Sequence, residues 1–375
     1  MKKYYFLGLA AGVKHPWKHL FTHGEARDAV ELKRYLGKRY DGEAMLCKNG
    51  RSALVLALKA YFNPGDAIIV NGFTCYAVYE AVKAAGLKPI FADISREDLN
   101  FNAKTLEKLW TGSTENKDSI SGIIVQNTLG NPVDIQAVEK FAGKHGLVII
   151  EDLAHCAGLE YQDGREAGTV GTAAALSFGK EKSIDAVSGG AVVFRHPKWH
   201  EIEAPKKLPK ISDYLRERWY PVFGLWCRRL TRVKLGGALM KVLLALHFVE
   251  KSADNRLDIT RGPAYFEAKV ALSQLKELEK SSERRLREFY LVDDRKTTLN
   301  ELRENGYFFD GFWYEKPVSP ERYYKKVHFD EKACPVAAEV ARRIVNLPEY
   351  YDESDLALAQ IIIDNHLVKE ERDQN

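Results

Sequence analysis

The chain has 375 residues, of which 45% are hydrophobic and 29% are charged, and its formal net charge is +4. This length predicts about two domains, and this composition excludes a disordered, collagenous or fibrous chain. The net charge is too small to indicate a nucleic-acid-binding protein. No window holds the roughly 18 uncharged apolar residues that a membrane span needs.

The five cysteines are scattered and form no CxxC pair. This pattern argues against a disulfide framework or a zinc site and favours a reducing cytosol. The N-terminus has a basic start and a short apolar stretch over 4–13, which together resemble a signal peptide. No clean cleavage site precedes the polar run that follows, so we expect no export. The sequence therefore predicts a cytoplasmic protein without a metal site.

Helical and extended patterns alternate from residue 51 to residue 194. Helices are predicted over 51–62, 74–86 and 134–145, and strands over 67–71, 88–93, 122–127, 147–152, 174–178 and 190–194. Short apolar strands separated by helices indicate an α/β fold with a mixed, mostly parallel sheet that is covered on both faces. Ligands of such sheets bind beyond the carboxyl ends of the strands, so a site is expected there.

The segment 204–251 differs in character from the rest of the chain. It holds eleven Lys and Arg against three Asp and Glu, a net charge of +8, and interleaves them with aromatic and aliphatic residues. One interpretation is an extra pair of helices that packs on the large domain or on a dimer partner. The other is a surface for an anionic ligand or a peripheral membrane contact. In the second case the candidates for binding a diphosphate are Arg216, Arg218, Arg228 and Arg229.

A second domain follows this basic segment. Residues 264–291 show a helical pattern, and mixed α and β patterns follow them. The sequence thus predicts a large domain over 1–254 and a smaller α+β domain over 255–375.

An aspartate and a pair of lysines follow neighbouring predicted strands. Asp152 ends the strand 147–152, and the loop after the next strand carries Lys180 and Lys182. Taken alone, Asp152 is more typical of a helix cap or a turn, and a loop lysine is more often a solvated charge. Together they are the minimum set for pyridoxal phosphate, because a lysine forms a Schiff base with its aldehyde and an aspartate keeps its pyridine nitrogen protonated.

A phosphate cradle is expected at the turn KNGRSAL, residues 48–54. Gly50 lies at the start of the predicted helix, where free backbone N–H groups, the helix dipole and the Ser52 hydroxyl favour an anion. Gly and Ser are also common capping residues, so this turn is weak support by itself.

Several segments together resemble the DegT/StrS family of pyridoxal-phosphate sugar aminotransferases, which have the fold type I of aspartate aminotransferase. The resemblance covers roughly residues 25–350. The matching segments are NGRSALVLAL, PGDAIIVNGFTCYAVYEAVKAAGLKPIFADI, VQNTLGNPVDIQAV, VIIEDLAHCAG, SFGKEKSIDAVSGGAVV, EAKVALSQLKEL and RRIVNLP.

The resemblance implies a role for each matching residue. Lys182 becomes the Schiff-base lysine and proton shuttle, Asp152 pairs with the pyridinium, and His155 lies near the phenolic oxygen of the cofactor. The phosphate is then held by four residues: Gly50, Arg51, Ser52 and Ser177. In many members of the family, the residue after a threonine is aromatic and stacks on the cofactor ring. Here Cys75 takes that position, with Tyr76 beside it.

The resemblance also implies an activity and its partners. We expect a homodimer that transfers an amino group from glutamate to a nucleotide-linked keto-sugar, for surface polysaccharide or glycoside biosynthesis. Two departures leave the particular sugar and the contact between subunits open: Ser188 replaces a common glutamate, and Thr260 lies where an asparagine often reaches the neighbouring phosphate.

Three alternatives remain open. A sugar dehydratase of this family usually carries histidine in place of Lys182. A cysteine desulfurase needs a reactive thiol on a mobile loop, for which Cys334 is the candidate, although its sequence context is typical of packing. A cofactor-binding regulatory or scaffold protein that uses 204–251 for docking is the third.

Overall fold

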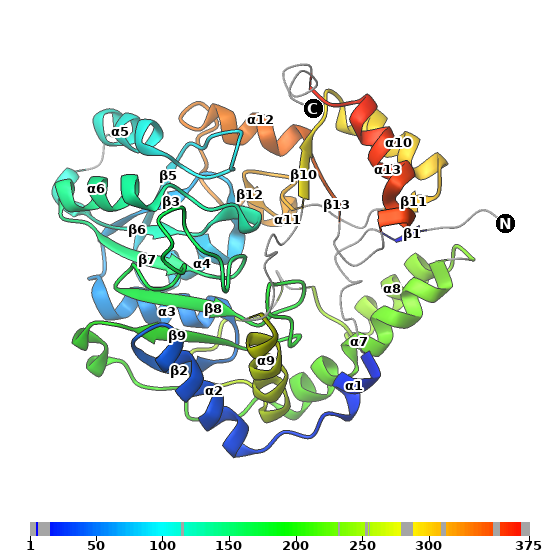
Figure 1. The fold of residues 1–375 in the computed structure, drawn as a ribbon, viewed down its shortest axis with the longest axis horizontal. Coiled ribbons are helices and arrows are strands. Elements are labelled where there is room, and N and C mark those ends of the chain that lie inside the picture. Colours follow the sequence, from blue (N-terminus) through cyan, green and yellow to red (C-terminus); the bar gives the residue numbers. More distant parts are fainter. Residues whose placement is uncertain are drawn as a thin grey trace.

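A seven-stranded sheet organises the larger part of the chain (Figure 1). The computed structural model describes residues 5–6, 16–113, 116–231, 233–251, 254, 256–278, 288–308, 313–347 and 353–368. The strand order is β2-β9-β8-β7-β6-β3-β5. Their bounds are β2 Glu43–Cys47, β3 Ala67–Asn71, β5 Lys88–Ala92, β6 Ile120–Val125, β7 Val148–Asp152, β8 Ala173–Ser177 and β9 Gly190–Phe194. Strand β9 is antiparallel to both neighbours and every other neighbouring pair is parallel, which confirms the expected mixed, mostly parallel sheet.

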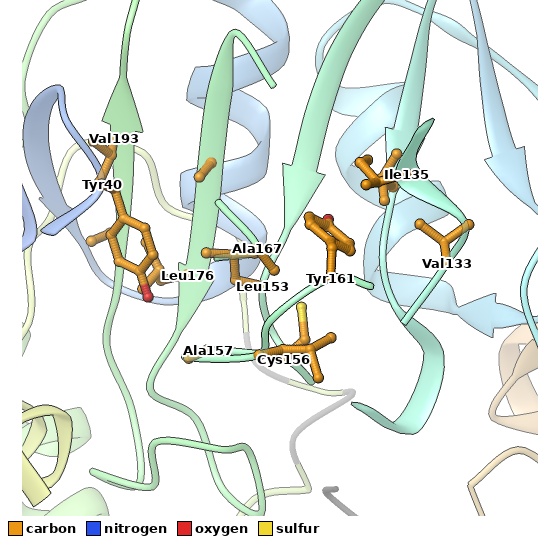
Figure 2. Close-up of a cluster of buried hydrophobic side chains, with 14 of the residues drawn as sticks. Tyr40, Val133, Ile135, Leu153, Cys156, Ala157, Tyr161, Ala167, Leu176 and Val193 are labelled. Atoms are coloured by element: carbon orange, nitrogen blue, oxygen red, sulfur yellow. The ribbon is translucent and has the colours of Figure 1, made fainter. Parts of the chain in front are cut away.

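Helices cover both faces of this sheet. One face packs on α3 (Gly50–Tyr61) and α4 (Tyr76–Ala84). The other packs on α2 (Ala26–Arg39), α5 (Ala103–Gly112), α6 (Ile135–His145) and α9 (Tyr265–Leu278). Figure 2 shows part of the second cluster, where Tyr40 lies against the strands that carry Leu176 and Val193. Since both faces are buried, the strands read as continuous apolar runs rather than as alternating patterns.

The predicted elements differ from the observed ones in few places. The predicted strands 67–71 and 190–194 match β3 and β9, and the other predicted strands of the sheet are displaced by at most two residues. The helix predicted over 264–291 is wrong at its end, because Glu288–Leu291 form strand β10. This strand pairs antiparallel with β13 (Ile344–Leu347), more than 50 residues further along the chain, and such a partner is invisible to a helical periodicity.

A second group of elements follows the sheet in sequence. Apart from β10 and β13, it contains α10 Arg295–Glu304, β11 Tyr307–Phe308, β12 Val318–Ser319, α11 Glu321–Tyr324, α12 Pro335–Arg343 and α13 Glu353–Asn365. The short strand β12 pairs with β4 (Thr74–Cys75), and β11 pairs with β1 (Tyr5–Phe6). The residue at which the large domain ends stays a prediction, and α9, beyond the predicted boundary at 254, packs on α2 in the core of the sheet.

The basic segment forms two helices, α7 (Ile211–Thr231) and α8 (Gly236–Ala245), which pack on each other. Helix α7 also packs on α1 (Pro16–Phe21), and Figure 1 shows the three helices at one side of the molecule. This agrees with the interpretation of 204–251 as an extra pair of helices. Within the described part of the chain, we find no helix with the length and apolar character needed to cross a bilayer.

Candidate active site

A pocket lies beyond the carboxyl ends of β7 and β8, where the sheet topology places a ligand. It is lined by Gly50, Arg51, Leu54, Thr74, Cys75, Ala77, Val78, Gln126, Asp152, Ala154, His155, Ser177, Lys182 and Tyr314. Seven of the nine site residues expected from the sequence are therefore brought together, and Ser52 and Tyr76 are not among the lining residues.

Lys182 and His155 are in direct contact in this pocket. The Nζ atom of Lys182 lies 3.0 Å from Nε2 of His155 and 4.2 Å from the centre of the Trp313 ring. The backbone N–H of Leu129 donates to Nδ1 of His155, so the neutral ring carries its proton on Nε2. That N–H donates to Lys182 only when the amine is neutral, which is the nucleophilic form of a lysine.

Asp152 is the last residue of β7, at the floor of the pocket. Its Oδ1 accepts a hydrogen bond from the backbone N–H of Ala154 at 3.0 Å. Burial raises the pKa of the carboxyl group, while this hydrogen bond and the nearby charge of Lys182 lower it. A second cation against Asp152 offsets the cost of burying its charge, and a protonated pyridine nitrogen is such a cation.

The start of α3 and the end of β8 approach each other closely. Asn49 caps α3 by accepting from the backbone N–H of Ser52 at 2.8 Å. A Cβ atom built on Gly50 would lie only 2.6 Å from Cβ of Ser177, so the approach needs glycine at this position. The two residues frame a small cradle at a helix N-terminus, which suits a phosphate group.

Arg51 borders the same cradle and forms an ion pair with Glu80. The Ser52 hydroxyl points elsewhere, since it donates to the carbonyl oxygen of Asp258 at 3.0 Å. The expected role of Ser52 in binding the phosphate stays a prediction.

Cys75 lines the pocket, whereas the Tyr76 ring stacks on Tyr323 with ring centres 4.5 Å apart. This geometry favours Cys75 as the residue that faces the cofactor ring.

Two aromatic residues of the site were not predicted. The hydroxyl group of Tyr314 lies 3.3 Å from Nε2 of His155, and the Trp313 ring contacts both Lys182 and His155. Burial raises the pKa of Tyr314 well above its usual value, so it stays a neutral phenol. The pair lies more than 130 residues after Lys182, and no spacing in the sequence links the two.

An α/β sheet with a lysine, an aspartate and a helix-start cradle around one pocket defines a pyridoxal-phosphate enzyme of fold type I. The residues present fit this cofactor: the half-buried Asp152 suits its ring nitrogen, Lys182 its aldehyde, and the Gly50–Ser177 cradle its phosphate. The model of the DegT/DnrJ/EryC1/StrS aminotransferase family matches residues 17–220. The chain belongs to this family of pyridoxal-phosphate-dependent aminotransferases.

Individual proteins are similar over most of the chain. A UDP-N-acetyl-3-dehydro-alpha-D-glucosamine 3-aminotransferase of Acidithiobacillus ferrooxidans is 28% identical over 84% of this chain and 81% of its own. A "pleiotropic regulatory protein" of Geobacillus stearothermophilus is 26% identical over 81% of this chain and 79% of its own. A solved GDP-4-keto-6-deoxy-D-mannose-3-dehydratase of E. coli with bound hydrated PLP shares the fold, with a TM-score of 0.65, 16% identity and coverage of 97% and 100%.

Proposed function

We propose that this aminotransferase moves an amino group from glutamate to a keto-sugar that is linked to a nucleoside diphosphate. The observation that carries the proposal is the pocket in which Lys182, Asp152 and the Gly50–Ser177 cradle meet. The similarity to an aminotransferase named for a UDP-linked keto-sugar supports this substrate class. The product would serve surface polysaccharide or glycoside biosynthesis, and we propose a homodimer in the cytoplasm.

The site residues divide the work between binding and proton transfer. Bound pyridoxal phosphate supplies an aldehyde that takes up the amino group and a ring that accepts the electron pair left on carbon. Asp152 would keep the pyridine nitrogen protonated, and Gly50, Arg51 and Ser177 would hold the phosphate. Lys182 would bind the resting cofactor and, once released, take a proton from the substrate carbon and return it.

His155 would orient Lys182 during these steps. Its ring is fixed on one side by the Leu129 N–H and lies within 3.3 Å of the Tyr314 hydroxyl on the other. The Nε2 proton then points at Lys182 and at Tyr314. This arrangement would keep the amine of Lys182 inside the pocket, beside the His155 ring.

Half-reactions with the purified full chain test this function. The protein loaded with pyridoxal phosphate is mixed with glutamate, and the visible spectrum and the released 2-oxoglutarate are recorded. We expect one 2-oxoglutarate per site, followed by equimolar amine transfer when a nucleotide-linked keto-sugar is added. Release of 2-oxoglutarate without transfer to any of a panel of UDP-, GDP- and dTDP-linked keto-sugars would refute the sugar substrate.

A regulatory protein is the second candidate, and the similarity to a relative named as a pleiotropic regulatory protein is the observation that favours it. In that case the protein binds the cofactor but does not turn over. The same experiment separates the two candidates, because a regulatory protein leaves glutamate unchanged even though its cofactor absorbs in the visible range.

A further inference from the structure

The outer face of α7 and α8 exposes large apolar side chains that the proposed chemistry does not use. We call this the outer surface. Its members are each between 36% and 62% exposed: Leu215, Trp219, Trp226, Leu230, Val233, Leu235, Val242, Leu246 and Phe248. Exposed apolar residues are ordinary when scattered, but a gathered set of this size marks an interaction site.

Helix α8 is apolar on both of its sides. Met240 and Leu243 are buried against Tyr220 and Cys227 of α7. On the opposite side, Ala238, Val242 and Ala245 follow helical spacing and are exposed, with Lys241 as the one charge among them. A helix that is apolar all round is normally covered on all sides, so the exposed side of α8 lacks its covering layer in the single chain.

The exposed residues of the two helices form one surface rather than two. The Phe223 ring of α7 lies 6.1 Å from the Trp219 ring, 5.9 Å from the Trp226 ring and 6.1 Å from the Phe248 ring just after α8. Helix α1, which packs on α7, also carries two exposed rings, those of Trp17 and Phe21. The three helices lie together in Figure 1.

All of the exposed charges in the described part of 204–251 are positive. They belong to Lys206, Lys207, Lys210, Arg229, Lys234, Lys241 and Lys251. The three acidic residues of the segment are withdrawn from the surface. Asp213 pairs with Lys48 at 2.6 Å, Glu250 pairs with Arg216 at 2.8 Å, and Glu217 is buried. Arg229, Lys234 and Lys241 lie directly beside exposed apolar residues of α7, α8 and the turn between them, so the outer surface is apolar and cationic at once.

We propose that the outer surface docks the protein on an anionic lipid bilayer. Tryptophan and aliphatic side chains would enter the boundary between headgroups and acyl chains, while the lysines would contact lipid phosphates. A second copy of the chain fits this surface less well, because a two-fold interface would bring two cationic surfaces together. The proposal is independent of the proposed catalytic function, since it concerns residues outside the pocket.

Co-sedimentation of the cofactor-loaded full chain with large vesicles tests the proposal. One set of vesicles is pure phosphatidylcholine, and the other contains about one third phosphatidylglycerol at physiological salt. We expect at least about tenfold stronger binding to the anionic vesicles, and weaker binding as salt is raised. The double variants Lys234→Glu/Lys241→Glu and Val242→Ser/Leu246→Ser should each lower this binding by about tenfold or more.

Matched variants on other exposed helices control for charge and hydrophobicity. Lys104→Glu/Lys108→Glu on α5 makes the same charge change, and Leu358→Ser/Ile361→Ser on α13 makes the same loss of exposed apolar area. Both should bind vesicles like the unaltered protein. All of the altered residues are exposed, and far-ultraviolet circular dichroism with the yield of loaded cofactor verifies folding.

Three outcomes would overturn the proposal. The first is no binding to anionic vesicles, and the second is binding by both outer-surface variants that is as strong as that of the unaltered protein. The third is an absence of vesicle binding together with a dimer that Val242→Ser/Leu246→Ser dissociates in sedimentation equilibrium. That third result would assign the outer surface to a second copy of the chain.

Discussion

The strand-end pocket and the α7–α8 hairpin meet at one loop, residues 178–189, and they hold its two lysines in different ways. Lys182 faces the pocket, 3.0 Å from the His155 ring. Lys180, two residues earlier, is buried on the hairpin side, 4.0 Å from the centre of the Tyr220 ring, and donates to the carbonyl oxygen of Glu250. The comparison shows that one lysine of the loop lines the pocket, while the other is held by contacts to the hairpin.

The hairpin also holds the loop by packing. Val187 has a φ of +73°, a conformation that a β-branched residue rarely adopts, and its side chain is buried against residues of α7 and α8. The Asp185 carboxylate accepts from the backbone N–H groups of Glu181 and Val187 at 2.8 and 2.9 Å. The segment added between the sheet and α9 is therefore a support for the loop that carries Lys182.

Separate substitutions of Lys182 and Lys180 should give the largest difference in cofactor attachment and kcat. Lys182→Ala should abolish covalent attachment of the cofactor and lower kcat by about 10⁴-fold, because the nucleophile and the proton shuttle are lost together. Borohydride reduction followed by peptide mass spectrometry, together with single-turnover rates, measures both effects.

Lys180→Met is the matched control. It should keep the reduced cofactor attached to Lys182 but lower the free energy of unfolding by about 1–3 kcal/mol, since it removes one of the two lysines, Lys180 and Lys48, whose charges stabilise the ionised form of the buried Glu217. If covalent attachment of the cofactor is lost in Lys180→Met and kept in Lys182→Ala, the roles of the two lysines have been assigned the wrong way round.

Asp152→Asn tests the pocket side of the comparison with a smaller expected effect. The amide is similar in shape but cannot keep the pyridine nitrogen charged, so we expect kcat to fall by about 100-fold or more while the fold persists. Single-turnover release of 2-oxoglutarate measures the loss. Asp118→Asn, at an exposed position, should leave the rate unchanged. An Asp152→Asn enzyme with normal rates would remove Asp152 from the site.

The sequence was sufficient for the parts of the site that backbone topology brings together. Asp152 and Lys182 follow adjacent strands of a buried sheet, and strand ends in such a sheet share one edge. It was insufficient where a distant segment folds back over that edge. Tyr314 and Trp313 reach His155 from another group of elements, and the Ser52 hydroxyl is taken by the carbonyl of Asp258. These contacts depend on tertiary packing, which leaves no periodicity in the chain.

The pH dependence of stability reports on the loop between the two regions. Burial raises the pKa of Asp185 to about 6, from an ordinary value of 3.8. Between about pH 4 and pH 6 the folded protein then holds a proton that the unfolded chain has released. Its free energy of unfolding should therefore decrease as the pH rises through this window, by up to about 3 kcal/mol from this group.

Urea unfolding of the protein and of Asp185→Asn at several pH values isolates this contribution, because the other groups titrate alike in both. The difference in unfolding free energy, unaltered protein minus variant, should fall from about pH 4 to pH 6 and stay level above it. A difference that is flat across the window would mean that the surroundings of Asp185 in the folded protein do not raise its pKa.

Gly50→Ala carries the smallest expected effect and tests the cradle alone. The added methyl group would overlap Cβ of Ser177, so α3 and β8 must separate by a small amount. Overpacking of this kind costs about 1–2 kcal/mol, which corresponds to about a tenfold weaker affinity for pyridoxal phosphate. Gly143→Ala in α6 meets no atom within 4 Å and serves as the control. Because the change leaves Lys182 and Asp152 in place, kcat at saturating cofactor should stay near normal, and a loss of kcat as large as that of Asp152→Asn would show that the cradle positions the reacting groups as well as the phosphate.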